Sequence, residues 1–221
     1  MPNSIRSRST RVNPATLLMQ PWTWGQIEVD GLTTAVVGTG SVNVAEPRVI
    51  DITTGATTGG TALARTADNS HWSRGVVGII NFDKRVVLKV TIRTVSATTN
   101  GKFRFTFGKA PATGVGALAV KGIGFQIDNL AINGLSHDGT DLTTTDLSTN
   151  LAADQTLAEF IIESHAGTVR FYVDNVLKGT STGGPTGNRD SDPVIQLEVD
   201  NGADNAAQRH IINQIQYAIE Q

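Results

Sequence analysis

Residues 85–107 read RVVLKVTIRTVSATTNGKFRFTF, and this stretch decides the fold class. Apolar side chains take alternate positions on both sides of a short polar break: Val86, Leu88, Val90 and Ile92 before it, Phe103, Phe105 and Phe107 after it. Successive side chains of a strand point to opposite faces, so a period of two predicts half-buried β-strands. The break contains Asn100-Gly101, a strong signal for a tight hairpin, and we expect the two strands to be joined by one.

The same period of two recurs along most of the chain. Polar turn residues separate the apolar sets, and Asp174-Asn175 can take the positive φ angles of a tight turn. We also expect a hairpin at Thr39-Gly40. The strands predicted in this way cover residues 26–30, 33–37, 41–45, 123–127, 157–163, 169–173, 176–179, 195–199 and 211–219. Short strands separated by turns predict an all-β protein, a two-sheet antiparallel β-sandwich (jelly roll) with an extended N-terminal arm.

Length and composition support a single sandwich domain. A chain of 221 residues fits one large all-β domain, and we expect an arm at residues 1–27 followed by the sandwich at residues 28–221. Cysteine is absent, which excludes disulfides and thiolate metal sites. No apolar run approaches the roughly 20 residues of a membrane span, and the first residues do not resemble a secretory signal. We therefore expect neither membrane contact nor secretion.

Charge is distributed unevenly between the arm and the body. Residues 1–27 contain three arginines and no acid, whereas the remainder holds 15 basic and 20 acidic residues. A basic arm on an acidic body favours docking on an acidic surface, with a solvated terminus as the alternative. The residues that we expect to bind a partner are Arg6, Arg8, Arg11, Leu17, Leu18, Trp22 and Trp24. The two tryptophans could also anchor the arm to its own core.

No pattern of catalytic residues emerges. Glu198 and Asp200 share one face of a predicted strand, as paired carboxylates of glycosidases do, but position 203 is alanine and supplies no third acid. We interpret the two as a solvent-facing acidic strand end. The Gly38-Thr39-Gly40 run lacks the third glycine and the following helix of a dinucleotide site. We expect no enzyme, no catalytic residue and no cofactor.

Binding motifs are equally sparse. The loops at residues 136–141 and 188–192 carry oxygen ligands suited to calcium, but neither matches the twelve-residue calcium loop, and Asp, Asn and Gly are ordinary turn residues. The four histidines lack ligand spacing, so we predict no metal site. Basic patches interleaved with aromatics are missing, which argues against direct nucleic-acid binding.

Two stretches resemble a known family. Residues 122–139 and residues 167–179, the latter reading GTVRFYVDNVLKG, are similar to the middle of a concanavalin A-like (laminin G-like) jelly roll, although Asn175 stands where a glycine is usual. The resemblance covers about residues 76–219. It implies a fold found in lectins, glycosidases and viral structural proteins, and the lectin and glycosidase metal and carboxylate motifs are missing here. The remaining features resemble jelly-roll proteins of tailed bacteriophages.

Three functions follow as hypotheses. The first is a non-enzymatic virion structural protein, a bacteriophage capsid-decoration or head/tail accessory subunit located in the virion. Its partners would be other copies of itself or a major capsid or tail protein, bound through the arm and the sandwich surfaces. The alternative is a carbohydrate-binding (lectin-like) module, with a glycan bound on a sheet face or on the loops at residues 136–141 and 183–193. A glycosidase that uses Glu198 and Asp200 is the weakest reading.

Overall fold

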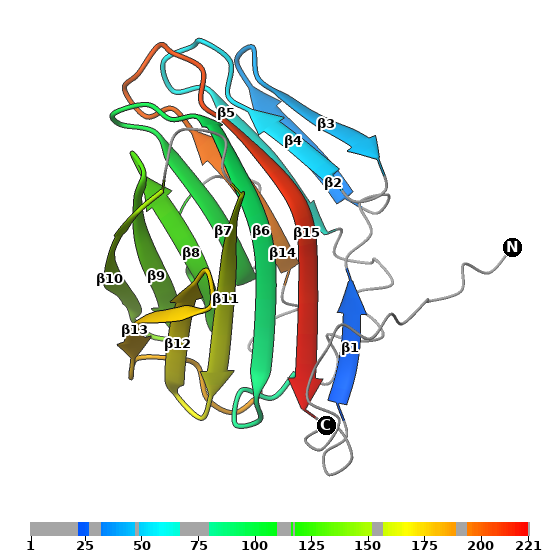
Figure 1. Cartoon of the computed structure of the whole chain (residues 1–221), viewed down its shortest axis with the longest axis vertical. Coiled ribbons are helices and arrows are strands. Elements are labelled where there is room, and N and C mark those ends of the chain that lie inside the picture. The colour runs from blue at the N-terminus through cyan, green and yellow to red at the C-terminus, as the bar shows by residue number, and fades with distance from the viewer. Residues whose placement is uncertain are drawn as a thin grey trace, which may run out of the picture.

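The computed structural model describes residues 22–26, 32–46, 49–66, 80–109, 116, 118–151, 157–188 and 194–220. These residues form fifteen strands and no helix, and hence no helix long and apolar enough to cross a membrane. The strands build two antiparallel sheets that pack face to face, which confirms the predicted β-sandwich (Figure 1). The proposed division at residue 27 stays a prediction.

Sheet A runs in the order β13-β12-β11-β6-β15-β4-β3, with β1 paired to β15 beside this path. Its strands are β1 (Trp22–Gln26), β3 (Ser41–Glu46), β4 (Val49–Thr53), β6 (Val86–Ser96), β11 (Leu157–His165), β12 (Thr168–Val173), β13 (Val176–Ser181) and β15 (Arg209–Glu220). Sheet B runs in the order β10-β9-β8-β7-β14-β5-β2. Its strands are β2 (Leu32–Val37), β5 (Thr61–Thr66), β7 (Lys102–Lys109), β8 (Gly122–Asp128), β9 (Ala131–His137), β10 (Leu142–Asn150) and β14 (Val194–Asp200).

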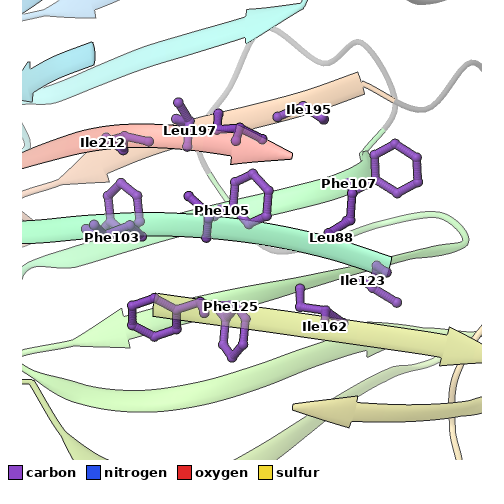
Figure 2. Close-up of a cluster of buried hydrophobic side chains, with 14 of the residues drawn as sticks. Leu88, Phe103, Phe105, Phe107, Ile123, Phe125, Ile162, Ile195, Leu197 and Ile212 are labelled. Carbon is purple, nitrogen blue, oxygen red and sulfur yellow. The ribbon is translucent and has the colours of Figure 1, made fainter. Parts of the chain in front are cut away.

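The core lies between the two sheets and follows the predicted alternation. Side chains of β6 are alternately buried and half-buried, and the three phenylalanines of β7 are fully buried. Phe125 of β8 meets Phe160 and Phe171 of sheet A edge to face, with ring centroids 4.8 and 5.6 Å apart. Such aromatic pairs add to the burial term and hold the two sheets in register. Figure 2 shows the inward side chains of both sheets interleaved.

Two predicted hairpins are wrong. The Asn100-Gly101 turn closes with a hydrogen bond from the Gly101 N–H to the Thr98 carbonyl, but β6 before it belongs to sheet A and β7 after it to sheet B. Likewise, residues 38–40 carry the chain from β2 in sheet B to β3 in sheet A. In a sandwich a tight turn can link strands that pack face to face. The turn signal in the sequence does not distinguish this crossing from a hairpin.

The turn at Asp174-Asn175 is confirmed. Both residues have positive φ, at 50° and 65°, and they join β12 to its antiparallel partner β13. Asp174 also accepts a hydrogen bond from the Glu159 N–H, with 2.9 Å between Oδ1 and N. The side chain thus ties the turn to β11.

Candidate functional site

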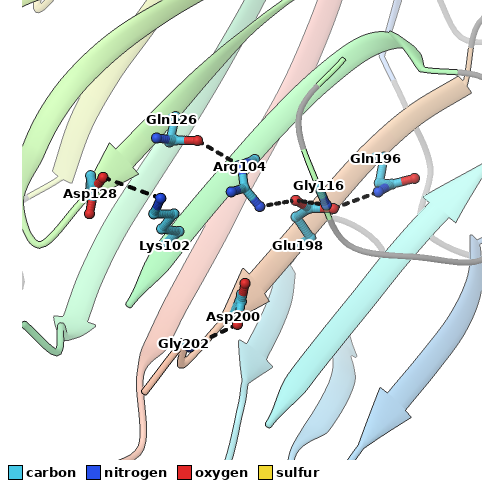
Figure 3. A network of polar contacts seen from close by, with 9 residues as sticks. All are labelled: Lys102, Arg104, Gly116, Gln126, Asp128, Gln196, Glu198, Asp200 and Gly202. Atoms are coloured by element: carbon cyan, nitrogen blue, oxygen red, sulfur yellow. Dashed lines mark hydrogen bonds and ion pairs between the residues drawn. The ribbon is translucent and has the colours of Figure 1, made fainter. Parts of the chain in front are cut away.

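The face of sheet B that points away from the core carries a buried polar network. Strand register places Arg104 of β7 directly opposite Gln126 of β8 and Glu198 of β14, and Gln196 lies two residues before Glu198 on the same face. The Arg104 and Glu198 side chains are only 9% and 1% exposed. Figure 3 shows the four side chains, with Gly116 next to Glu198.

Three donors among the described residues bind the glutamate of this network. Oε1 of Glu198 accepts hydrogen bonds from Arg104 Nη1 at 2.6 Å and from the Gly116 N–H at 2.9 Å. Its Oε2 accepts one from Gln196 Nε2 at 2.7 Å. Arg104 in turn donates from Nε to Gln126 Oε1 at 2.7 Å. Charge-assisted hydrogen bonds of this kind are short and strong, and one of them joins the backbone of Gly116 to the sheet.

The interpretation of Glu198 as a solvent-facing acid is therefore wrong. It points away from the core as expected, but it is buried, pairs with Arg104 and accepts a hydrogen bond from the Gly116 N–H. Asp200, the second acid, accepts a hydrogen bond from the Gly202 N–H at 2.8 Å (Figure 3). A carboxylate engaged on both oxygens and closed off from solvent is poorly suited to general acid or base catalysis. We therefore interpret this network as structural and call it the structural clasp.

A second polar site is exposed to solvent at one end of the sandwich. A hollow of about 430 Å³ forms between the β9–β10 loop, the β11–β12 turn and the loop that follows β13. Its lining includes Asp138, Thr140, Thr168, Thr182 and Thr186. The two loops predicted to bind a glycan, residues 136–141 and 183–193, thus both line this hollow, the second one with residues up to Thr186. Asn188 pairs instead with Asn81, and residues 189–193 lie outside the described residues.

Backbone contacts shape this hollow. The Gly167 N–H donates to the Pro185 carbonyl at 3.2 Å, and the Gly184 N–H donates to the Gly167 carbonyl at 2.9 Å. Gly184 also needs to be glycine, because a Cβ there would lie 2.5 Å from Val169 Cγ2. The loop after β13 is therefore held against the β11–β12 turn.

Asp138 is a fixed anion at the rim of the hollow. Its Oδ1 accepts hydrogen bonds from the N–H groups of Thr140 at 2.6 Å and of Asp141 at 2.8 Å. The Asp141 bond first and the Thr140 bond second lower the pKa of this carboxyl below its usual value, because both favour the charged form. Oδ1 is thus engaged in a turn, and the carboxylate stays ionised at neutral pH.

The lining chemistry suits a ligand rich in hydroxyl groups. Each threonine hydroxyl can donate one hydrogen bond and accept two, and Asp138 supplies acceptors. Of the described lining residues, Asp138 is the one with a charge. Across the described residues, no group of three His, Asp or Glu side chains could hold a metal ion. The loop at residues 136–141, considered for calcium and interpreted as an ordinary turn, thus gains no geometric support as a metal site.

Of the seven residues predicted to bind a partner through the arm, the structure describes two. Arg6, Arg8, Arg11, Leu17 and Leu18 lie outside the described residues. Trp22 and Trp24 fall on β1, which pairs antiparallel with residues 216–220 of β15. The end of the expected arm therefore adds a strand to its own sheet. The partner-binding role of all seven residues stays a prediction.

Comparison with known proteins bears on the fold. No family model matches the sequence, and the search of curated proteins finds no significant match. Among solved structures, the carbohydrate recognition domain of Emp47p is similar at a TM-score of 0.54 and 14% identity, over 85% of this chain and 88% of that one. The likeness is one of fold. It agrees with the concanavalin A-like resemblance in the sequence.

Two further structures share this sandwich. An endo-β-1,4-glucuronan lyase from the fungus Trichoderma reesei has a TM-score of 0.58 and 11% identity, over 88% of this chain and 94% of that one. A protein of unknown function, SO2946 from Shewanella oneidensis MR-1, has a TM-score of 0.56 and 14% identity, over 97% of both chains. The fold thus serves both binding domains and an enzyme.

Proposed function

We propose that this protein is a non-enzymatic, carbohydrate-binding module that holds a glycan in the hollow lined by Asp138 and the threonines. The observation that carries the proposal is the meeting of three loops around one exposed, hydroxyl-lined hollow. The likeness to the Emp47p carbohydrate recognition domain supports it. The lyase neighbour does not favour catalysis in this chain, because Glu198 is closed into the network with Arg104.

The charge of the hollow favours neutral glycans. Asp138 is anionic, and the described lining residues include no Lys or Arg to balance it. A sialylated or uronic-acid glycan would bring a second negative charge close to this carboxylate, and like charges repel. We expect neutral oligosaccharides to bind more tightly than acidic ones of the same size.

A glycan array, followed by calorimetry on the best neutral ligand, tests the proposal. Thr140→Val and Thr182→Val each remove one hydroxyl while keeping side-chain shape, and each should weaken binding by about threefold to tenfold if a hydrogen bond is lost. Thr99→Val is the matched control, because Thr99 is an exposed threonine in the turn at the opposite end of the sandwich. Absence of binding across the array, or equal losses in all three variants, would contradict the proposal.

A structural role in a phage virion stays a prediction. It requires contacts with other copies or with a capsid or tail protein, and the arginines expected to make them lie outside the described residues. Deletion of residues 1–20 tests it directly. The truncated chain should fold but lose incorporation into its particle, and unchanged incorporation would remove the arm hypothesis.

A further inference from the structure

The edge strands of the two sheets are protected unequally. Open strand edges expose unpaired backbone groups, and natural proteins guard them with charges, prolines or bulges because such edges pair readily with other chains. Sheet A ends in β13 and β3, with β1 as a short further edge strand beside β15, and sheet B ends in β10 and β2.

Three of these edges carry an irregularity, and two of them carry a charge as well. Strand β10 contains Asp146, where its register with β9 shifts. Strand β13 contains Lys178, and its pairing with β12 is interrupted by a bulge. Strand β3 ends at Glu46, where its register with β4 shifts. Each device discourages a further strand from adding to that edge.

Strand β2 has none of these devices. It reads LTTAVV, without a charge or a proline, and it pairs with β5 in unbroken register from Leu32 to Val37. Every residue after Leu32 is exposed, and Val36 and Val37 are 40% and 62% exposed. A regular, uncharged and β-branched edge is well suited to accept another strand.

We propose that β2 pairs antiparallel with β2 of a second copy of this chain, about a two-fold axis at Ala35. A two-fold axis perpendicular to the sheet keeps each side chain on its own face, so directly opposite residues must share a face. Centring on Ala35 meets this rule. It sets Val36 opposite Thr34 on the core side and Val37 opposite Thr33 on the outer side, and it joins the two copies of sheet B into one sheet.

The same strand in a second copy is the occupant that these residues fit. Closed two-fold interfaces are self-complementary, and an uncharged strand does not repel its own copy. About the Ala35 axis, every exposed valine faces a threonine, and β-branched cross-strand pairs stabilise antiparallel sheets. This inference does not depend on glycan binding.

Single-cysteine crosslinking tests the pairing, because the chain contains no cysteine of its own. Directly opposite Cα atoms of antiparallel strands lie about 4.5–5.5 Å apart, within the range that a disulfide spans. Ala35→Cys should therefore form a covalent dimer under mild oxidation. Val176→Cys, at an exposed position on the β13 edge, is the matched control and should stay monomeric on a non-reducing gel.

The native mass of the unmodified chain completes the test. We expect a dimer, and we expect Ala35→Lys to raise the dimer dissociation constant at least about tenfold, because two like charges then meet at the axis. Val176→Lys should leave it unchanged. A strictly monomeric chain, an Ala35→Cys variant that does not crosslink, or an Ala35→Lys variant that dimerises normally would overturn the proposal. Circular dichroism and the unfolding midpoint of each variant separate loss of pairing from loss of folding.

Discussion

His210 shows how a titratable side chain is accommodated in this core. Its ring is fully buried and lies 4.6 Å from the Phe103 ring, centroid to centroid. Gln208 Nε2 lies 3.0 Å from Nε2 of the imidazole, and an amide nitrogen can only donate. Nε2 is therefore the acceptor, and the proton sits on Nδ1, from which it is donated to Thr94 Oγ1 at 3.2 Å. The neutral ring is thus satisfied on both nitrogens.

This arrangement predicts a stability that falls in mild acid. Burial lowers the pKa of His210 from 6.5 to about 3, so the ring stays neutral in the folded chain and binds a proton only on unfolding. The full contribution of His210 to the free energy of unfolding should be present above pH 6.5. Below that pH the free energy of unfolding should fall by up to about 1.4 kcal/mol per pH unit, until the pH reaches the folded-state pKa of about 3.

Urea unfolding at several pH values between 6.5 and 5 measures this slope, above the range where carboxylates titrate. His210→Gln should abolish the His210 part of the slope, at a cost in stability at pH 7. His165→Gln, at an exposed histidine, should leave the slope intact. A slope that survives His210→Gln would show that another group causes it.

The Arg104–Glu198 pair predicts a second effect on stability. Glu198→Ala leaves a buried guanidinium without its carboxylate, and removal of one partner of a buried pair costs about 3–5 kcal/mol. Lys102 and Asp128 form an exposed pair on the same face, 3.6 Å apart. Asp128→Ala is the control and should cost less than about 1 kcal/mol.

Chemical unfolding of both variants decides between a structural and a catalytic Glu198. Similar small losses in the two variants would contradict the structural clasp. They would reopen the glycosidase reading, because catalytic acids are typically not needed for folding.

At the scale of the strand, Gly134 sets how closely the sheets approach. It faces the core from β9, and a Cβ at this position would lie 2.6 Å from ring carbons of Phe171 in sheet A. Phe171 is fully buried and packs against Phe125, so its ring has little room to move. Glycine here permits contact between a backbone and an aromatic face.

Gly134→Ala should therefore destabilise the sandwich. Overpacking of a close-packed core costs about 1–3 kcal/mol. Ala131→Val is the control, because it enlarges an exposed side chain of the same strand and should change stability by no more than about 0.5 kcal/mol. Thermal unfolding of both variants measures the difference, and equal midpoints would show that Phe171 can yield.

The strand patterns could be predicted from the sequence, whereas their pairing could not. A period of two located β6 and β7, because burial on one face imposes it. The turn at Asn100-Gly101 gave no sign that these strands lie in different sheets. Glu198 looked exposed because its burial depends on Arg104, 94 residues away in sequence. The hollow likewise needs residues 138–140 to meet residues 182–186, a contact that local pattern does not encode.

For the whole molecule, the decisive connection is the one along β15. This strand pairs on one side with β6, and on its other side with β4 near its start and with β1 near its end. Figure 1 shows β1 continuing the line of the sheet beside β15. Strand β1 thus covers an edge that carries the buried residues Tyr217 and Ile219.

Two truncations separate the strand from the segment before it. Deletion of residues 1–20 keeps β1 and should leave the unfolding midpoint within about 2 °C of the full chain, since it removes none of the described pairing. Deletion of residues 1–26 removes β1 and opens five residues of β15, from Gln216 to Glu220. Each kcal/mol lost lowers the midpoint of a chain of this size by about 2–4 °C, and we expect a fall of at least about 4 °C. The opened edge should also promote association that grows with protein concentration.

Calorimetry and light scattering on the two truncations measure both effects. Equal midpoints would mean that β1 is not part of the stable sheet, and that residues 22–26 belong with the arm.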